Sequence, residues 1–359
     1  MDNAYLKYFT PLKIANSLIN LLDFHDNSSV IDICCGSCNL LKAAKTKNPT
    51  INCTGVDISV CTNKNNFTLY IEDGRDFALN NKGKYDISLA NPPFGKEANN
   101  DYTDKLFCGI YEDINIKRME VEMLIANLLI LHDKGTLLII LPSTIVYGSL
   151  YKNFRKIISK NHYVEAIIDL PINAFYPERI KCNALIIQKQ PNKKLSTKHY
   201  NMTDDFELIK KKSIKANLIQ DGFWIGFSEE KNKEYIIHQG KISSECFTDG
   251  SEFVEVLHTS KPSKYWQPSI RYAKINKTTN YVKAEKGDII ISRVGSSAGY
   301  KYVYNGEDRY ISDCLFVIKQ PSEKIKKEIL ELDLFSIIGG LSTPYITAQG
   351  IYNLYCSNK

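Results

Sequence analysis

The sequence Tyr85-Asp86-Ile87-Ser88-Leu89-Ala90-Asn91-Pro92-Pro93-Phe94 joins a short apolar run to a loop that contains two prolines. The run has the length and composition of a buried strand. Because proline lacks a backbone donor and has a fixed φ, the prolines end the strand and stiffen the loop. In open α/β sheets, ligands bind at the carboxyl ends of the strands. The stretch therefore predicts an α/β sheet with a binding loop at residues 91–94.

A turn of small residues follows another predicted strand upstream. Residues 29–33 have the apolar character of a buried strand, residues 34–39 are small or polar, and a helix begins at Leu40. A strand, a tight turn and a helix in this order allow a nucleotide-like ligand to approach the backbone closely. Asp32 and Gly36 lie in this unit and are candidate ligand contacts.

Two further acidic residues follow or end predicted strands. Asp57 ends a second strand and lies 25 positions after Asp32, which suits an acid that binds ribose hydroxyls. Asp73 follows a third strand at 67–71, and its carboxylate could accept a hydrogen bond from an adenine amine. The strand ends are thus expected to carry one nucleotide site.

The loop at 91–94 has the groups needed to activate a planar amine. The side-chain oxygen of Asn91 and the backbone carbonyl of Pro92 can accept the two amine hydrogens and favour the pyramidal, more nucleophilic nitrogen. Phe94 can stack on the attached ring, a contact of about 1–3 kcal/mol for a base. Catalysis would then rest on positioning. Asn and Pro are also common in ordinary turns, so the loop alone leaves that alternative open.

The order of these motifs resembles that of the gamma class of DNA amino-methyltransferases, which contains Taq-type adenine methyltransferases and type I modification subunits. The segment Lys7-Tyr8-Phe9-Thr10-Pro11, followed by an apolar helix at 14–22, resembles the amino-terminal motif of that class. The resemblance implies an α/β fold with a Rossmann-like, seven-stranded methyltransferase sheet and S-adenosyl-L-methionine as cofactor. It assigns catalysis to Asn91, Pro92 and Phe94. The implied cofactor contacts are Phe9, Thr10, Asp32, Gly36, Asp57, Asp73 and Asn91.

Later segments continue the same order. Residues 135–143 resemble the fifth strand of the class, and residues 167–187 resemble its closing hairpin. In that class an aromatic residue of the hairpin clamps the flipped base, a role that Phe175 or Tyr176 would take here beside Phe94. Cys38 departs from the pattern, because relatives usually have a second glycine there. Its Cβ would disfavour a positive φ or crowd the cofactor.

The composition is that of a globular protein with room for two domains. The chain has 359 residues, of which 43% are hydrophobic. It contains no apolar run near ~20 residues and no signal-peptide pattern at its start, so we expect a cytoplasmic protein without a membrane segment. Cys35 and Cys38 have CxxC spacing, but no second pair lies nearby. We therefore expect reduced packing cysteines and no metal site.

The positive charge is concentrated in one segment. The net charge is +6, and residues 151–200 contain 10 Lys and Arg against 3 Asp and Glu. A basic patch beside the site would suit a DNA backbone, and Lys181 is our candidate DNA contact there. A solvated helix face explains the part from 152 to 160 equally well. The basic residues are Lys152, Arg155, Lys156, Lys160, Arg179 and Lys181.

The pattern changes after Gln190, and we expect a methyltransferase domain at 1–195 and a second domain at 205–359. The second half contains short β-like segments with many aromatics and one predicted helix at 322–332. The segments 287–300, 311–318 and 339–346 resemble target recognition domains of type I specificity subunits. This resemblance implies a smaller α+β domain that reads DNA, with Arg293 and Lys264 as candidate contacts.

These features together favour a site-specific, S-adenosylmethionine-dependent methyltransferase that acts on the exocyclic amino group of adenine in duplex DNA. The resemblance implies a restriction-modification system, with a separate restriction nuclease subunit or a second copy of the chain as further partners. Methylation of a protein glutamine amide or of an RNA base is an alternative, since such enzymes also activate a planar nitrogen. A catalytically decayed DNA-binding specificity subunit is the other alternative.

Overall fold

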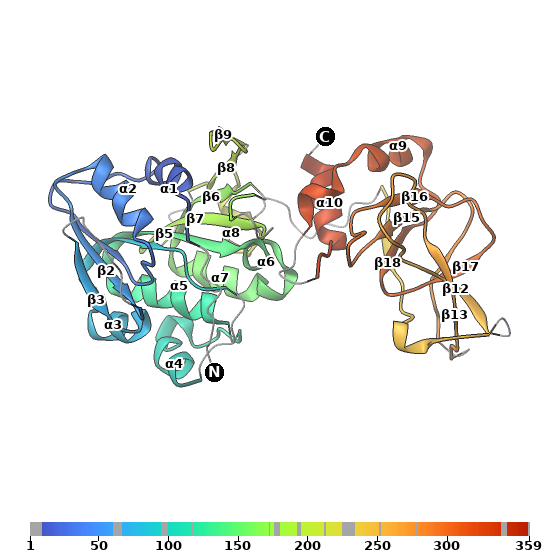
Figure 1. The fold of residues 1–359 in the computed structure, drawn as a ribbon, viewed down its shortest axis with the longest axis horizontal. Helices are drawn as coiled ribbons and strands as arrows, with labels where there is room; N and C mark the ends of the chain where they lie inside the picture. Colours follow the sequence, from blue (N-terminus) through green and yellow to red (C-terminus); the bar gives the residue numbers. More distant parts are fainter. Residues whose placement is uncertain are drawn as a thin grey trace. The chain divides into compact units, whose positions relative to one another are not determined.

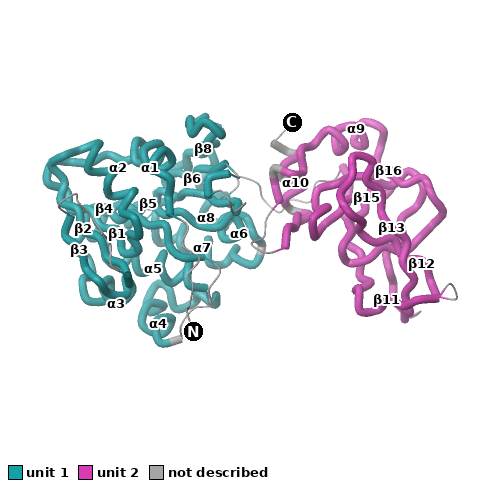
Figure 2. The backbone as a smooth tube through the Cα atoms, in the orientation of Figure 1, with its two compact units in different colours: residues 1–228 teal, residues 229–359 magenta. Residues whose placement is uncertain are grey.

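The computed structural model (Figure 1) describes residues 9–59, 67–94, 100–116, 118–171, 173–175, 180–191, 195–211, 213–224, 234–250, 253–276, 279–338 and 343–357. The chain divides into two compact units, residues 1–228 and residues 229–359 (Figure 2). Each unit has its own sheets and its own apolar core. We therefore describe them one at a time.

The first unit is built on one nine-stranded sheet in the order β3-β2-β1-β4-β5-β7-β6-β8-β9. Strands β1 to β5 pair in parallel, and β7 is antiparallel to both β5 and β6. The strands are β1 (Ser29–Asp32), β2 (Asn52–Asp57), β3 (Thr68–Ile71), β4 (Tyr85–Ala90), β5 (Leu131–Pro142), β6 (Tyr163–Asp169), β7 (Cys182–Gln188), β8 (Lys198–Met202) and β9 (Leu208–Lys210).

The sheet has nine strands where the family resemblance implied seven. The two additional strands arise because the chain returns beside β6 after β7: β8 pairs with β6 in parallel, and β9 turns back along β8. The strand order reverses between β1 and β4, since β2 and β3 lie to one side and β5 to the other. A reversal of this kind opens a crevice at the carboxyl ends of the strands, which is where ligands bind in such sheets.

Helices cover both faces of this sheet because its central strands are apolar on both faces. In β5, Leu137 and Ile139 pack into one core and Leu138 and Ile140 into the other, as the two-residue period of a strand requires. One core takes the helices α3 (Gly74–Asn80), α4 (Asn100–Leu106), α5 (Met119–Ile130) and α7 (Lys152–Asn161). The other takes α1 (Leu12–Ile19) and α2 (Asn39–Lys47), which lie together on the opposite face in Figure 1.

The end of the first unit lies later in the chain than the expected boundary at 195–205. After α6 (Ser143–Tyr147) and α7, the short helix α8 (Ala216–Gln220) packs beside α7. Trp224 is fully buried, and its Nε1 donates to Ser159 Oγ at 2.6 Å. Residues 205–224 therefore belong to the first unit, although the second domain was expected to begin at residue 205.

The second unit combines two antiparallel-rich sheets with two helices. A four-stranded sheet has the order β10-β18-β15-β16, and a five-stranded sheet has the order β11-β13-β12-β17-β14. The elements are β10 (Ile237–Gln239), β11 (Phe247–Thr248), β12 (Val254–His258), β13 (Ser269–Ala273), β14 (Lys283–Ala284), β15 (Ile289–Ser292), β16 (Lys301–Val303), β17 (Arg309–Ile311), β18 (Leu315–Ile318), α9 (Glu323–Glu331) and α10 (Ala348–Ser357).

The core of the second unit explains why β15 reads as a continuous apolar run. All four residues of β15 are buried. Ile289 and Ile291 pack with residues of the helices α9 and α10. Ile290 belongs to a separate core cluster, with Leu257 and Trp266. Among the described residues there are also four short 3₁₀ helices: Gly109–Tyr111, Ser149–Tyr151, Ser244–Cys246 and Leu334–Ile337. Within the described ranges, no helix has the length and apolar character needed to cross a membrane.

Candidate active site

A pocket lies at the carboxyl ends of β1, β2, β3 and β4 and encloses roughly 960 Å³, part of it open to solvent. Its mixed polar and apolar lining is that of a small-molecule site. The pocket brings together every predicted cofactor contact, from five separate parts of the first unit. These lining residues are Phe9, Thr10, Asp32, Gly36, Asp57, Asp73 and Asn91.

A buried acid, Asp32, ends β1, and a glycine, Gly36, lies in the turn that follows. Asp32 is 2% exposed, and its Oδ1 accepts the backbone N–H of Cys34 at 3.0 Å. Burial raises the pKa of Asp32 to about 8, so in the protein alone this carboxyl is largely protonated at neutral pH. Gly36 has a φ of +48°, and a Cβ there would lie 2.7 Å from the Phe9 ring. Glycine at 36 thus satisfies both the backbone and the close approach of Phe9.

Cys38 adopts a left-handed conformation, with a φ of +59°. Its side chain is 1% exposed and packs in the core formed with α1 and α2, and it does not line the pocket. The departure from glycine therefore places its strain in the backbone at the start of α2 rather than in the pocket. For a residue with a Cβ, this conformation costs roughly 1 kcal/mol.

Asp57 is held rigidly at the end of β2. Its Oδ2 accepts the N–H of Gly36 at 2.9 Å, and its Oδ1 accepts both the N–H and the hydroxyl of Ser59, at 3.0 and 2.7 Å. The turn after β1 and the end of β2 are therefore joined through one carboxylate. An acid fixed in this way is suited to the hydroxyl groups of a sugar.

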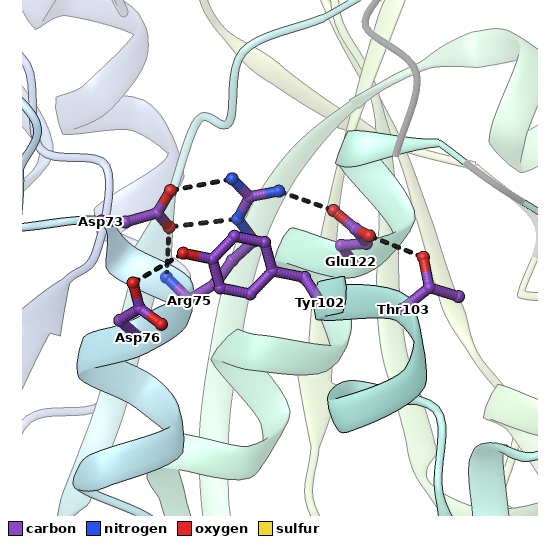
Figure 3. Close-up of polar contacts among 6 residues, drawn as sticks. All are labelled: Asp73, Arg75, Asp76, Tyr102, Thr103 and Glu122. Carbon is purple, nitrogen blue, oxygen red and sulfur yellow. Dashed lines mark hydrogen bonds and ion pairs between the residues drawn. The ribbon is translucent and has the colours of Figure 1, made fainter. Parts of the chain in front are cut away.

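Asp73 caps α3 and is paired with Arg75 through several hydrogen bonds (Figure 3). Asp73 Oδ1 accepts from the backbone N and the Nε of Arg75, at 2.9 and 3.0 Å, and Oδ2 accepts from Nη2 at 2.8 Å. The other side of the guanidinium donates from Nη1 to Glu122 Oε2 at 2.7 Å, and Glu122 Oε1 accepts from Thr103 at 2.7 Å. The guanidinium also lies 3.8 Å from the ring centroid of Tyr102.

The loop after β4 is tied to the wall of the pocket through Thr10. Asn91 Nδ2 donates to Thr10 Oγ1 at 3.0 Å, and the carbonyl of Thr10 accepts from Asn39 Nδ2 at 2.9 Å. Asn91, Pro92 and Pro93 all line the pocket. Of the three residues predicted to perform catalysis, Asn91 and Pro92 thus border the space that the predicted cofactor contacts enclose, whereas Phe94 is not part of its lining.

The two aromatic residues predicted to stack on the target base contact each other. Phe94 and Phe175 are 3% and 4% exposed, and their ring centroids are 6.4 Å apart at 87°. Neither ring lines the pocket. The fold therefore brings these two predicted stacking residues into an edge-to-face contact. Tyr176, the other hairpin candidate, lies outside the described residues.

Arg155 is not available to bind DNA, so the basic patch expected around it is smaller than its sequence suggested. Its side chain is buried within the first unit and donates to the carbonyls of Gly222, Ile145 and Gly148 at 2.8, 2.9 and 2.7 Å. Burial lowers the pKa of Arg155 to about 10. Sequence reasoning missed this role because the spacing of Arg155 is that of a solvated helix face. Arg179 lies outside the described residues, and Lys181 is half-buried just before β7.

The candidate DNA contacts of the second unit occupy different settings. Arg293 donates Nε to the carbonyl of Asp313 at 2.8 Å and lies over the Phe316 ring. Lys264 is exposed beside Tyr265, a residue that is 83% exposed. A hollow on this unit is lined by Lys261, Arg271, His258, several hydroxyl residues and the turn at 294–297, and no carboxylate is among its lining residues. Sequence analysis named Arg293 but did not predict this grouping.

The pocket lining also contains residues that were not predicted as site residues, among them Asn39, Arg75, Met119 and Met123. Asn39 and Arg75 each follow a predicted motif directly, and an acid followed two positions later by Arg at a helix start is a usable signal. Met119 and Met123 come from α5, and no local pattern distinguishes them from core residues. In the described part of the chain, no three His, Cys, Asp or Glu side chains are grouped so as to hold a metal ion.

Comparison with solved structures finds similar folds at low identity. A type I restriction-modification methyltransferase subunit from Streptococcus thermophilus is 17% identical over 59% of this chain and 51% of its own, with a TM-score of 0.45. The type IIG restriction endonuclease BpuSI is 12% identical over 89% of this chain and 53% of its own, with a TM-score of 0.50. The type IIL restriction-modification enzyme MmeI, solved with DNA, is 11% identical over 95% of this chain and 64% of its own, with a TM-score of 0.51.

The chain thus covers less than two thirds of each of these proteins. No protein of curated function matches it. The family described as N-6 DNA Methylase matches residues 4–234, which include the whole pocket and the loop at 91–94. Because this match spans more than half of the sequence, the chain belongs to the N-6 DNA methylase family.

Proposed function

We propose that the chain transfers a methyl group from S-adenosylmethionine to the exocyclic amino group of adenine in duplex DNA, as the modification activity of a restriction-modification system. The observation that carries this proposal is that Asn91, Pro92 and Pro93 line the same pocket as the acidic strand ends. Membership of the N-6 DNA methylase family supports it. The proposal joins a nucleotide site and an amine-activating loop in one space.

The hydrogen-bond acceptors of the pocket fit this cofactor. A sulfonium nucleoside of this kind carries ribose hydroxyls, an adenine amine and an ammonium group, all of which donate hydrogen bonds or positive charge. The pocket offers the carboxyl groups of Asp57, Asp73 and Asp32. We assign Asp57 to the ribose, Asp73 to the adenine amine, and Phe9 and Thr10 to the methionine part. When bound, the cofactor would supply an electrophilic methyl group.

The residues of the loop would then prepare the target nitrogen. The bond from Asn91 Nδ2 to Thr10 fixes the orientation of the amide, so that Asn91 Oδ1 and the Pro92 carbonyl are the two acceptors for the amine hydrogens. Fixed acceptors need no reorganisation as the amine becomes pyramidal, which is the basis of electrostatic preorganisation. We assign the faces of an extruded base to Phe94 and Phe175, whose rings would separate to admit it.

The second unit would bind the DNA backbone through its hollow. Lys261 and Arg271 bring two positive charges to a surface rich in hydroxyl groups, and phosphate oxygens accept from both kinds of donor. Arg293, Lys264 and Lys181 remain further candidates. We rank Arg293 below the hollow because its Nε already donates to the carbonyl of Asp313. A separate nuclease subunit or a second copy of the chain would complete the system.

The test is to supply the purified protein with S-adenosylmethionine carrying an isotopic methyl label and, in separate reactions, adenine-unmethylated DNA, total RNA and a protein extract. The expected result is label in N6-methyladenine after digestion of the DNA. Label in RNA or in protein amides would replace the proposed substrate, and label in cytosine would change the base. The absence of label in every substrate, with cofactor binding retained, would indicate a binding subunit.

A further inference from the structure

Arg75 lies at the centre of a network of charged side chains, and the methyl transfer proposed above gives this residue no role. The residue is 7% exposed, yet it lines the cofactor pocket. Figure 3 shows its guanidinium between two carboxylates, Asp73 on one side and Glu122 on the other. Glu122 belongs to α5 and is fully buried. Buried charges of this kind persist only when they are paired and hydrogen-bonded, so the three side chains act as one unit.

The bonds from Arg75 leave little acceptor capacity on Asp73. A carboxylate has about four lone-pair positions for hydrogen bonds. Two on Oδ1 are used by the backbone N and Nε of Arg75, and one on Oδ2 is used by Nη2. One position on Oδ2 therefore remains for a ligand. An amine that offers one N–H fits this position, and a carbonyl oxygen does not.

The same bonds keep Asp73 ionised. Burial by itself would raise the pKa of this carboxyl, but the hydrogen bonds and charge of Arg75 outweigh burial and lower it. The guanidinium is held in turn by Glu122, by the ring of Tyr102 and, through Glu122, by Thr103. Tyr102 and Thr103 both lie on α4, the first helix after the loop at 91–94. Arg75 thus connects the nucleoside wall of the pocket to α3, α4 and α5.

We propose that Arg75 is a positioning residue that sets the pocket's selectivity for a 6-aminopurine nucleoside, by presenting one ionised acceptor of Asp73 to one amine hydrogen. The inference rests on the proposed function, since it takes the adenine of the cofactor as the ligand of Asp73. It predicts discrimination between the cofactor product S-adenosylhomocysteine and its deaminated form, S-inosylhomocysteine, in which the purine also carries a hydrogen on N1. S-adenosylhomocysteine has the amine, and S-inosylhomocysteine has a carbonyl in its place.

The experiment measures the Kd of both compounds by calorimetry for the full chain, without any methyl transfer. The unsubstituted protein should prefer the amine by about 10-fold or more, the difference expected for one hydrogen bond to a charged group. The preference should change little between pH 6 and pH 8. Arg75→Met should reduce it to less than about 3-fold. Because burial then raises the Asp73 pKa, the remaining preference should also fall as the pH is lowered.

Arg75→Lys separates charge from geometry. Lysine keeps the positive charge but cannot form the paired bonds, so Asp73 stays ionised with a less fixed orientation. We expect an intermediate preference and a flat pH response. Arg309→Met is the matched control, because Arg309 is paired with Glu255 in the second unit at 2.5 Å. It should leave the affinity for both compounds unchanged.

The outcomes separate this inference from the proposed function. Wild-type preference in a folded Arg75→Met protein would overturn the role of Arg75, and so would wild-type preference in Arg75→Lys if the Met variant does not fold. Binding of both nucleosides with equal affinity by the unsubstituted protein would overturn the role of Asp73 while leaving the cofactor class intact. Failure to bind either compound would overturn the proposed function and the inference together.

Discussion

The pocket of the first unit and the hollow of the second present opposite kinds of charged groups. In the pocket, Asp57 accepts three hydrogen bonds from its neighbours, and Asp73 is gripped by Arg75. In the hollow, the charged groups Lys261 and Arg271 are exposed and of the opposite sign. A fixed set of acceptors selects one small molecule by its donors. Exposed cations beside hydroxyls suit a polyanion whose charges repeat along its length.

Because of this difference, we expect substitutions in one unit to leave the binding properties of the other unit unchanged. Substitutions at the pocket should change the chemistry or the cofactor affinity and leave DNA affinity largely intact. Substitutions at the hollow should do the reverse. The predictions below test this separation in order of decreasing effect.

Asn91→Ala should lower methyl transfer by at least about 100-fold, because one of the two fixed acceptors for the amine is lost. The affinity for S-adenosylhomocysteine should stay within a few-fold of the original, since the acidic contacts remain. Single-turnover methylation and calorimetry measure the two quantities. Asn52→Ala, which removes an exposed amide on β2, is the control. Methyl transfer at the original rate in Asn91→Ala would remove the loop from the mechanism.

Lys261→Ala combined with Arg271→Ala should weaken DNA binding by about 10-fold or more and reduce the salt slope of log Kd by about 2. Cofactor affinity should be unchanged. Fluorescence anisotropy at several salt concentrations gives both values. The matched control is Lys286→Ala with Lys327→Ala, which removes two exposed lysines of the same unit that do not line the hollow. An equal loss in the control would show that only net charge matters.

The stability of the cofactor-free protein should fall with rising pH because of Asp32. Its pKa in the folded protein is about 8 and its ordinary value is 3.8, so the stabilising contribution is complete below pH 4 and is lost as the pH approaches 8. Urea unfolding between pH 5 and 8 should show a slope from this group of at most about 1.4 kcal/mol per pH unit. Asp32→Asn should flatten the curve, and equal slopes for both proteins would contradict the assignment.

Several of these residues were predictable from sequence, and the reason is local. Asp32, Asp57 and Asp73 each follow or end an apolar run, and parallel strands bring such positions to one edge whatever their distance along the chain. Arg155 was not predictable, because its partners are the carbonyls of Gly222, Ile145 and Gly148, and one of them lies 67 residues away. Strand β8 was missed because its sequence is polar, and β9 because it has only three residues. Tertiary pairing decided each of these cases, and no local pattern records it.

The smallest expected effect concerns Cys38, where a glycine variant should be more stable than an alanine variant. Its φ of +59° disfavours any residue with a Cβ, whereas glycine adopts it freely. Cys38→Gly should therefore be more stable than Cys38→Ala by about 1 kcal/mol, although both lose the buried thiol. Chemical denaturation of the two variants measures the difference. A more stable alanine variant would show that the left-handed backbone is relaxed at little cost.

In the proposed reaction, the edge-to-face contact of Phe94 with Phe175 would have a kinetic consequence for searching DNA. Each ring already has an aromatic neighbour, so an arriving nucleobase exchanges one set of ring contacts for another and gains only their difference. A weak net gain means that a base extruded at a wrong sequence returns quickly to its duplex. The closed rings would thereby shorten the dwell time of an extruded base wherever no other contact holds it.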